Sequence, residues 1–74
     1  MDILIQTSNY IYIMELKKNQ SAAIALQQIE NKGYAAPFAS DKRRIFKIGL
    51  NFNTKSRKID DWAIRQTDTE NNPQ

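Results

Sequence analysis

Residues 2–17, DILIQTSNYIYIMELK, decide the fold of this chain. Two runs rich in branched aliphatic and aromatic residues, Asp2 to Gln6 and Tyr10 to Leu16, flank the short polar stretch Thr7-Ser8-Asn9. Runs of this composition are typical of β-strands, and a short polar break between two of them is typical of a turn. The stretch therefore predicts a β-hairpin.

The register of the hairpin follows from its turn. A two-residue loop at Ser8-Asn9 places Asp2 opposite Glu15 on the neighbouring strand. Because side chains alternate along a strand, Lys17 shares the face of Glu15. The other residues of that face are apolar apart from Gln6, and the opposite face is apolar as well. We therefore expect both faces of the hairpin to be covered, as in strands at the centre of a layered domain.

The chain after the hairpin predicts one helix and two further strands. Residues 21–32 combine good helix formers with a recurring apolar face, with Ser21 or Asn19 as a possible N-cap and Gly33 as a stop signal. Strand-like runs follow at residues 44–52 and 58–66.

The connection through the helix is too long for a hairpin. The second and third strands are therefore expected to run parallel, and the last strand to return as an antiparallel edge on which Trp62 covers apolar surface. We predict an α/β domain with a mixed sheet, element order β-β-α-β-β, over residues 1–66. Residues 67–74 lack large apolar side chains and are expected to form a disordered polar tail.

The composition excludes several kinds of chemistry. The 74 residues contain neither cysteine nor histidine. Their absence removes disulfides, thiolate zinc sites, cysteine nucleophiles and His-dependent triads, so any catalysis must use carboxylates, lysine, hydroxyls or an oxygen-bound metal. The net charge of +3 suits a polyanionic partner without requiring one. No signal peptide or membrane span is recognisable, so we expect a cytoplasmic protein without membrane contact.

The facing acids Asp2 and Glu15 suggest a metal site. Two carboxylates side by side on a covered strand pair repel each other unless a cation or a shared proton relieves them. A hard divalent ion such as Mg²⁺ or Mn²⁺ takes one or two carboxylates, and the Leu16 carbonyl lies near enough in sequence to contribute. Lys17 beside that ion could orient the attacking water, which is the chemistry of phosphodiester hydrolysis.

The same residues resemble a known family. Asp2, followed by Glu15-Leu16-Lys17, is similar to the D-x(n)-(D/E)-x-K core of the PD-(D/E)XK nuclease superfamily. The similarity extends to further blocks and looks like the nuclease-like domain found at the C-terminus of bacterial proteins beside an AAA-ATPase-like region. These blocks are residues 10–17 (YIYIMELK), 25–29 (ALQQI), 32–34 (KGY), 48–52 (IGLNF) and 59–62 (IDDW).

The resemblance implies a restriction-endonuclease-like core that lacks its first helix and strand. It implies Asp2 and Glu15 as metal ligands, Lys17 as the catalytic lysine and the helix residue Gln28 as an auxiliary polar group. Gln28, Lys32 and Tyr34 match positions that recur in the family pattern. The implied activity is a Mg²⁺-dependent nuclease acting on phosphodiester bonds, with DNA as the expected partner.

Two other interpretations stay open. The chain could be a non-catalytic module that forms a homodimer through an uncovered sheet edge, or it could bind nucleic acid without cleaving it. Lys42-Arg43-Arg44 is the candidate contact to a nucleic-acid backbone, although a basic cluster before a strand also serves to keep that strand solvated.

Overall fold

The computed structural model describes residues 1–67, and the predicted element order β-β-α-β-β is confirmed there. A short 3-10 helix follows the α-helix. The predicted tail lies outside the described residues except for Thr67, which ends the last strand. The elements are β1 (Asp2–Gln6), β2 (Tyr10–Lys18), α1 (Ala22–Lys32), η1 (Ala36–Phe38), β3 (Arg44–Asn53) and β4 (Lys58–Thr67).

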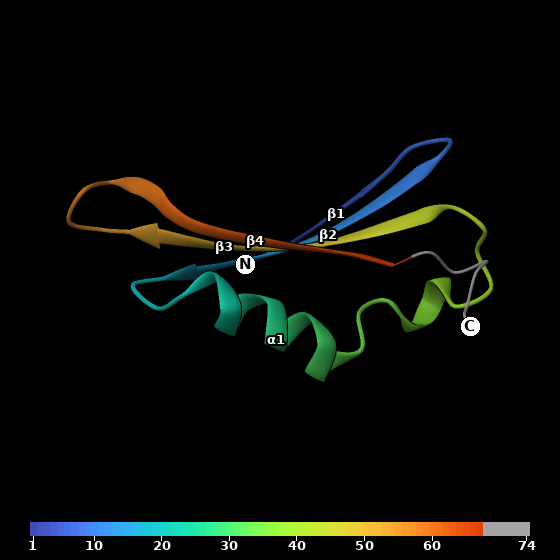
Figure 1. Ribbon diagram of the computed structural model, residues 1–74, viewed down its shortest axis with the longest axis horizontal. Coiled ribbons are helices and arrows are strands. Elements are labelled where there is room, and N and C mark those ends of the chain that lie inside the picture. The colour runs from blue at the N-terminus through green and yellow to red at the C-terminus, as the bar shows by residue number, and fades with distance from the viewer. Residues whose placement is uncertain (68–74) are drawn as a thin grey trace.

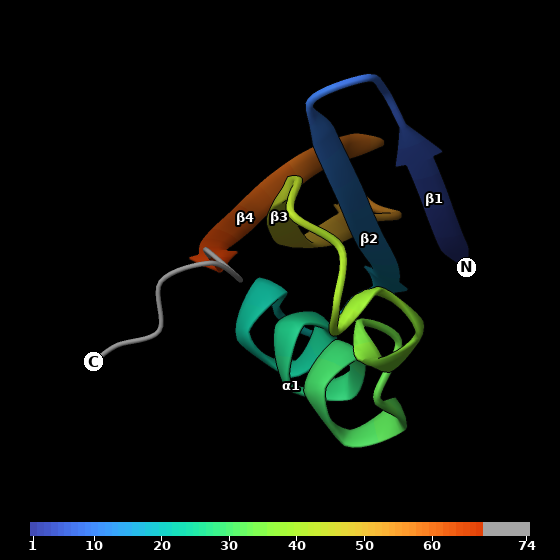
Figure 2. The same ribbon diagram turned by 90° about the vertical axis from the view of Figure 1, so that its right-hand side faces the viewer.

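The four strands form one mixed sheet in the order β1-β2-β3-β4. β1 and β2 pair antiparallel, β2 and β3 pair parallel, and β3 and β4 pair antiparallel. The predicted parallel crossover through the helix and the antiparallel last strand are therefore both confirmed. Figures 1 and 2 show a strongly twisted sheet with α1 and η1 on the same side of it.

The predicted signals at both ends of α1 are confirmed. The Ser21 hydroxyl accepts a hydrogen bond of 3.1 Å from the Ile24 amide, which is the N-cap arrangement. Gly33 closes the helix in the left-handed conformation, with φ of 63°, where a residue without Cβ is favoured. Asp61 from β4 also accepts from the Ala22 amide at 2.9 Å, so the start of the helix is fixed to the sheet.

The hydrophobic core lies between α1 and the central strands. The apolar stripe of the helix faces the side of β2 and β3 that was predicted to carry Glu15. The core cluster consists of Ile11, Ile13, Leu26, Ile29 and Ile45.

Gly49 allows α1 to approach the sheet closely. A Cβ at this position would collide with the carbonyl oxygen of Ala22 and would lie 2.8 Å from the Leu26 amide nitrogen. Gly49 also pairs with Glu15 in the β2–β3 register. The close approach therefore fixes the helix over the part of the sheet that holds the predicted site.

The other side of the sheet has no covering element within residues 1–67 (Figure 1). The expectation that both faces are covered is wrong for this part of the chain, because α1 and η1 pack on the same side. Trp62, expected to be an edge-covering residue, is 66% exposed. We call this surface the open face. Its apolar residues are Ile3, Ile5, Tyr10, Tyr12, Met14, Leu16, Phe46, Ile48, Leu50, Phe52, Ile59, Trp62 and Ile64.

Neither helix in the described part of the chain is long and apolar enough to cross a membrane.

Candidate active site

The predicted pairing of Asp2 with Glu15 is confirmed by the register of β1 and β2. The hairpin closes through Ser8-Asn9, and the Thr7 amide donates a hydrogen bond of 2.8 Å to the Tyr10 carbonyl. The two acids differ in environment, because Glu15 is only 1% exposed under α1 whereas Asp2 is exposed at the sheet edge. A buried and a solvated carboxyl group thus stand next to each other.

These different environments shift the two pKa values in opposite directions. Burial raises the pKa of Glu15, and hydrogen bonding with Asp2 and its negative charge raise it further. Interaction with Glu15 lowers the pKa of Asp2, and a hydrogen bond from Tyr34 lowers it as well. Paired acids with separated pKa values are typical of sites that either share a proton or hold a cation.

A cation already lies against this pair. The ammonium group of Met1 is 3.4 Å from Glu15 Oε2 and 3.2 Å from the Leu16 carbonyl oxygen. The second carboxylate oxygen, Glu15 Oε1, is buried and accepts no hydrogen bond within residues 1–67. Two oxygens of the site, Glu15 Oε2 and the Leu16 carbonyl oxygen, therefore contact a positive group, and a third, Glu15 Oε1, has no hydrogen-bond partner within residues 1–67.

This donor set fits a hard divalent metal. Asp2 and Glu15 supply carboxylate oxygens, and Leu16 supplies a carbonyl oxygen, which are the ligands Mg²⁺ prefers. No group of three or more His, Cys, Asp or Glu residues that could hold a metal occurs in the described part of the chain. An ion here would therefore take most of its remaining ligands from water or substrate, as Mg²⁺ commonly does.

Lys17 lies two residues beyond Glu15 on the same face of β2 and is half-buried. It lines a pocket of about 570 Å³ together with Met1, Leu16, Lys18 and Gln20. Met1 and Leu16, two of these lining residues, also contact each other beside Glu15, so the pocket that Lys17 lines is close to the carboxylate pair. The predicted trio of Asp2, Glu15 and Lys17 is brought together on neighbouring strands.

The match to a family model agrees with this geometry. The model of the PD-(D/E)XK nuclease superfamily matches residues 1–62. The chain belongs to the PD-(D/E)XK nuclease superfamily. The match spans the hairpin, α1, β3 and the first part of β4, and so includes every residue of the candidate site. No curated protein and no solved structure shows a significant similarity to the chain.

Two residues near the end of α1 join the nuclease-like site. The Tyr34 hydroxyl donates a hydrogen bond of 2.8 Å to Asp2 Oδ2, and the Lys32 Nζ lies 5.8 Å from the centre of the Tyr34 ring. Interaction with Tyr34 raises the pKa of Lys32, with smaller contributions from Asp2 and Glu15. Lys32 and Tyr34 match family positions in the sequence, but the sequence does not predict their contact with the carboxylate pair.

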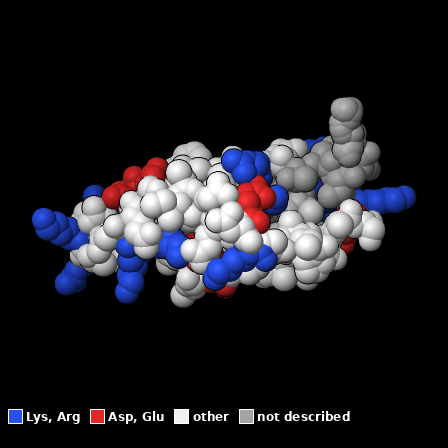
Figure 3. Space-filling view, turned by 90° about the horizontal axis from the view of Figure 1, so that it is seen from below, with Lys and Arg blue, Asp and Glu red and all other residues white. Residues whose placement is uncertain are grey.

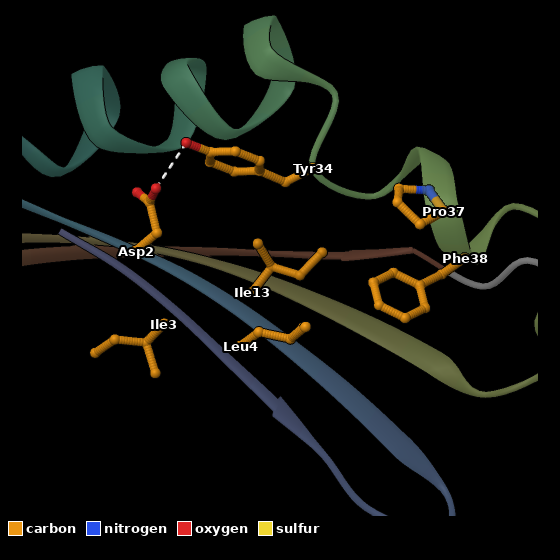
Figure 4. A pocket seen from close by; sticks show the side chains of 7 residues that line it. All are labelled: Asp2, Ile3, Leu4, Ile13, Tyr34, Pro37 and Phe38. Atoms are coloured by element: carbon orange, nitrogen blue, oxygen red, sulfur yellow. Dashed lines mark hydrogen bonds between the residues drawn. The ribbon is translucent and has the colours of Figure 1, made fainter.

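The hydrogen bond from Tyr34 to Asp2 lies at the edge of an apolar pocket of about 330 Å³ (Figure 4). The other residues that line this pocket are Ile3, Leu4, Ile13, Pro37 and Phe38. The Asp2 carboxylate therefore has an apolar wall on one side.

The remaining predicted residues lie farther from the trio or have other contacts. Gln28 is half-buried on α1, and its role as an auxiliary group stays a prediction. Arg44 pairs with Tyr10, whereas Glu15 pairs with Gly49, so the basic cluster lies about 17 Å along the sheet from the carboxylates. Lys42 and Arg44 are exposed at that end.

Arg43 has a structural role in addition to any binding role. Its guanidinium donates to both carboxylate oxygens of Asp41, to Gln6 Oε1 and to the Thr7 carbonyl. The hydrogen bonds from Arg43 lower the pKa of Asp41 to about 2. The hydrogen bonds of Arg43 thus connect the segment before β3 to the end of β1 and the turn of the β1–β2 hairpin.

A second basic group stands closer to Lys17. Lys55, Arg57 and Lys58 are exposed at the turn between β3 and β4. This turn lies beyond the end of β2, because Lys18 pairs with Phe52 near the end of β3. Lys and Arg side chains project from this end of the molecule in Figure 3, at the left of the view. The sequence showed these residues but not that the topology places them at the Lys17 end of the sheet.

Proposed function

We propose that this nuclease-fold chain hydrolyses phosphodiester bonds, with DNA as the substrate and Mg²⁺ or Mn²⁺ as the cofactor. The observation that carries the proposal is the pairing of Asp2 with the buried Glu15, with Lys17 on the same face of β2. Membership of the superfamily supports the reaction class. The proposal also includes a cytoplasmic, bacterial setting beside an AAA-ATPase-like region, which rests on the resemblance of the sequence blocks alone.

The residues of the candidate site act in three ways in this proposal. Asp2, Glu15 and the Leu16 carbonyl hold the divalent ion. A bound ion there would supply positive charge to the phosphate oxygens as negative charge develops on them. Lys17 orients the attacking water and adds a second positive charge on the same side. Tyr34 keeps Asp2 ionised and oriented, because its hydroxyl donates to the carboxylate.

The nucleic-acid backbone would follow the basic groups of the molecule. Lys17 and the exposed Lys55, Arg57 and Lys58 stand toward one end of the sheet, and Lys42, Arg43 and Arg44 stand at the other. Because Arg43 is held by Asp41, Gln6 and Thr7, we assign the main contacts at the second end to Lys42 and Arg44. Backbone contacts of this kind make affinity fall steeply with added salt.

The first experiment is a Mg²⁺ and Mn²⁺ titration of the 74-residue chain followed by amide NMR. We expect saturable changes at Asp2, Glu15 and Leu16 that are lost in Glu15→Gln and kept in the matched control Asp60→Asn. Asp60 is an exposed acid on β4, separated by β3 from the strand that carries Glu15, and it accepts hydrogen bonds from Asn51 and Asn53. Absence of binding at millimolar metal would refute an assembled two-carboxylate site.

The second experiment is a cleavage assay on single-stranded, double-stranded and supercoiled DNA and on RNA. Cleavage that needs metal and stops in chelator is the expected result. Salt-sensitive binding that persists in chelator without any cleavage would instead favour the non-catalytic alternative, a nucleic-acid-binding module. That alternative is supported by the exposed basic groups at both ends of the sheet.

The homodimer suggested by the sequence also stays a proposal. β1 is hydrogen-bonded to β2 and has no other strand neighbour within residues 1–67, so its outer edge is free to pair with another strand. An unpaired edge strand is a common route to strand-to-strand association.

A further inference from the structure

The open face exposes an apolar patch at the upper end of what monomeric proteins usually show, and patches of this size are often functional. Its six most exposed side chains, with exposed fractions from 38% to 66%, are Ile3, Ile5, Tyr10, Ile59, Trp62 and Ile64. At about 150–250 Å² for a large side chain, they leave on the order of 500 Å² of apolar surface in water. The seven half-buried apolar residues of the face lie on β2 and β3 and connect the exposed residues of β1 with those of β4.

This total approaches one side of a standard protein interface, which is about 800 Å² per partner. It is also continuous, since the strand register places Met14 between Ile3 and Ile48, and Ile48 beside Ile64. Tyr12 and Phe46 stack with ring centroids 5.4 Å apart, and Tyr10 contacts both rings. The surface is therefore preformed by strand pairing and does not need to be ordered on binding.

The interior of the open face carries no charged residue that would attract a polyanion. By register and alternation, Lys18 and Arg44 are the charged residues that share this face between Ile3 and Ile64, and they stand at opposite ends of the sheet. An interior without charge is typical of homodimer interfaces, which are more apolar than transient ones. Two such sheets packed face to face would form an apolar layer about 10 Å thick.

We propose that a second copy of this chain covers the open face, so that two sheets pack face to face around a two-fold axis. Trp62 and Ile64 are the main anchors, because they are the two most exposed of its large residues and lie on the same edge strand. This surface is distinct from the outer edge of β1. It is also opposite the face that holds Glu15 and Lys17, so the proposal does not depend on nuclease activity.

The test is sedimentation equilibrium of the 74-residue chain from micromolar to millimolar concentration, with two matched variants. Ile64→Lys places a charge on the open face, at a residue 53% exposed. Leu4→Lys places the same charge at a residue 52% exposed on the other face, beside the apolar pocket. Circular dichroism and amide NMR establish that both variants are folded.

We expect a dimer for the native chain and for Leu4→Lys, and at least a 10-fold weaker dimer for Ile64→Lys. Trp62 is the sole tryptophan of the sequence, so its fluorescence should shift to the blue with concentration in step with the mass. A monomer at all concentrations would overturn the proposal. A dimer that is weakened by Leu4→Lys but not by Ile64→Lys would also overturn it. The same holds for a dimer in which the Trp62 emission does not shift to the blue.

Discussion

The Tyr34 hydroxyl lies 2.8 Å from Asp2 Oδ2 and donates a hydrogen bond to it across 32 positions of sequence. The contact joins the residue after the helix C-cap to the first residue of the edge strand. It raises the pKa of Tyr34 and lowers that of Asp2, because the neutral phenol donates to the ionised carboxylate. One of the two carboxylates proposed as metal ligands is therefore oriented from the C-terminal end of α1.

Tyr34→Phe is expected to weaken metal binding without unfolding the chain. Loss of the hydroxyl should raise the pKa of Asp2 toward its ordinary value and lower the affinity for Mn²⁺ about 10-fold, since partners that orient a ligand contribute on this scale. Carboxyl carbon NMR follows the titration of Asp2, and calorimetry follows the metal. Tyr10→Phe is the matched control, because Tyr10 lies on the open face. An unchanged Asp2 titration would contradict the proposed role of Tyr34.

Glu15→Gln is expected to stabilise the metal-free chain at neutral pH. The pKa of Glu15 is higher in the folded chain than in the unfolded chain, so protonation of Glu15 favours the folded state. This contribution to the free energy of unfolding is complete below the unfolded pKa and is lost as the pH rises through the folded pKa. Ionisation of this buried carboxyl group, which its raised pKa opposes, should cost on the order of 1 kcal/mol at neutral pH. Thermal unfolding should therefore show a melting temperature several degrees higher for Glu15→Gln at pH 7.

The pH dependence separates this effect from an ordinary packing change. As the pH falls, the native Glu15 gains its proton, so the difference between the two melting temperatures should shrink at pH 4. A Glu15→Gln variant that is less stable than the native chain at both pH values would mean that the contact of Glu15 with Met1 outweighs the burial of its charge.

Lys17→Met is expected to slow catalysis strongly without weakening metal binding. Lys17 is not among the proposed ligands, and loss of a positive group that stabilises a transition state typically lowers kcat by about 10²–10³-fold. Single-turnover cleavage at saturating Mg²⁺ measures the effect, and NMR measures metal binding. Lys18→Met is the matched control, because Lys18 is adjacent in sequence and points to the opposite face of β2. Equal losses in both variants would indicate general charge attraction for the nucleic acid.

The hairpin shows why part of this site could be predicted from the sequence. A two-residue turn and strict alternation fix the register, so the pairing of Asp2 with Glu15 and the face of Lys17 follow from local rules. The contact between Tyr34 and Asp2 does not follow from them, because it depends on how close α1 comes to the sheet. The exposure of the open face could not be predicted for a similar reason. Its apolar pattern indicates that the face is buried in some contact but does not identify the element or partner that covers it.

Glu30→Gln is expected to lower stability at neutral pH but not in acid. The Glu30 carboxylate accepts hydrogen bonds from Lys47 Nζ at 2.9 Å and Arg65 Nη1 at 2.7 Å, so it joins α1 to β3 and β4. These bonds, that from Lys47 first, lower the pKa of Glu30. The stability they contribute is present above the unfolded pKa and is lost as the pH falls through the folded value.

The effect of Glu30→Gln should be about 1 kcal/mol at pH 7, because solvent partly screens the pair with Arg65. Urea unfolding at pH 7 and pH 3 measures it. Lys47→Met should cost more than Arg65→Met, since the Lys47 side chain is only 11% exposed and that of Arg65 is 54% exposed. The reverse order would show that burial does not decide the strength of these pairs.

Gly49→Ala is expected to be the most damaging single substitution of those considered, because its added methyl group meets backbone atoms. The Cβ would collide with the Ala22 carbonyl oxygen and crowd the Leu26 amide, and neither can move without shifting α1. We expect a loss of about 3 kcal/mol in the free energy of unfolding, at the upper end for overpacking. Displacement of α1 should also weaken metal binding, because Glu15 pairs with Gly49 beneath the helix.

Gly33→Ala separates crowding from backbone strain. Gly33 has a φ of 63° and nothing within 4 Å of an added Cβ, so its substitution should cost only about 1 kcal/mol, from strain in the left-handed conformation. Urea unfolding of both variants gives the comparison. Equal losses would mean that α1 can slide on the sheet to accept a methyl group at Gly49, and the close approach would then not be what fixes the helix over Glu15.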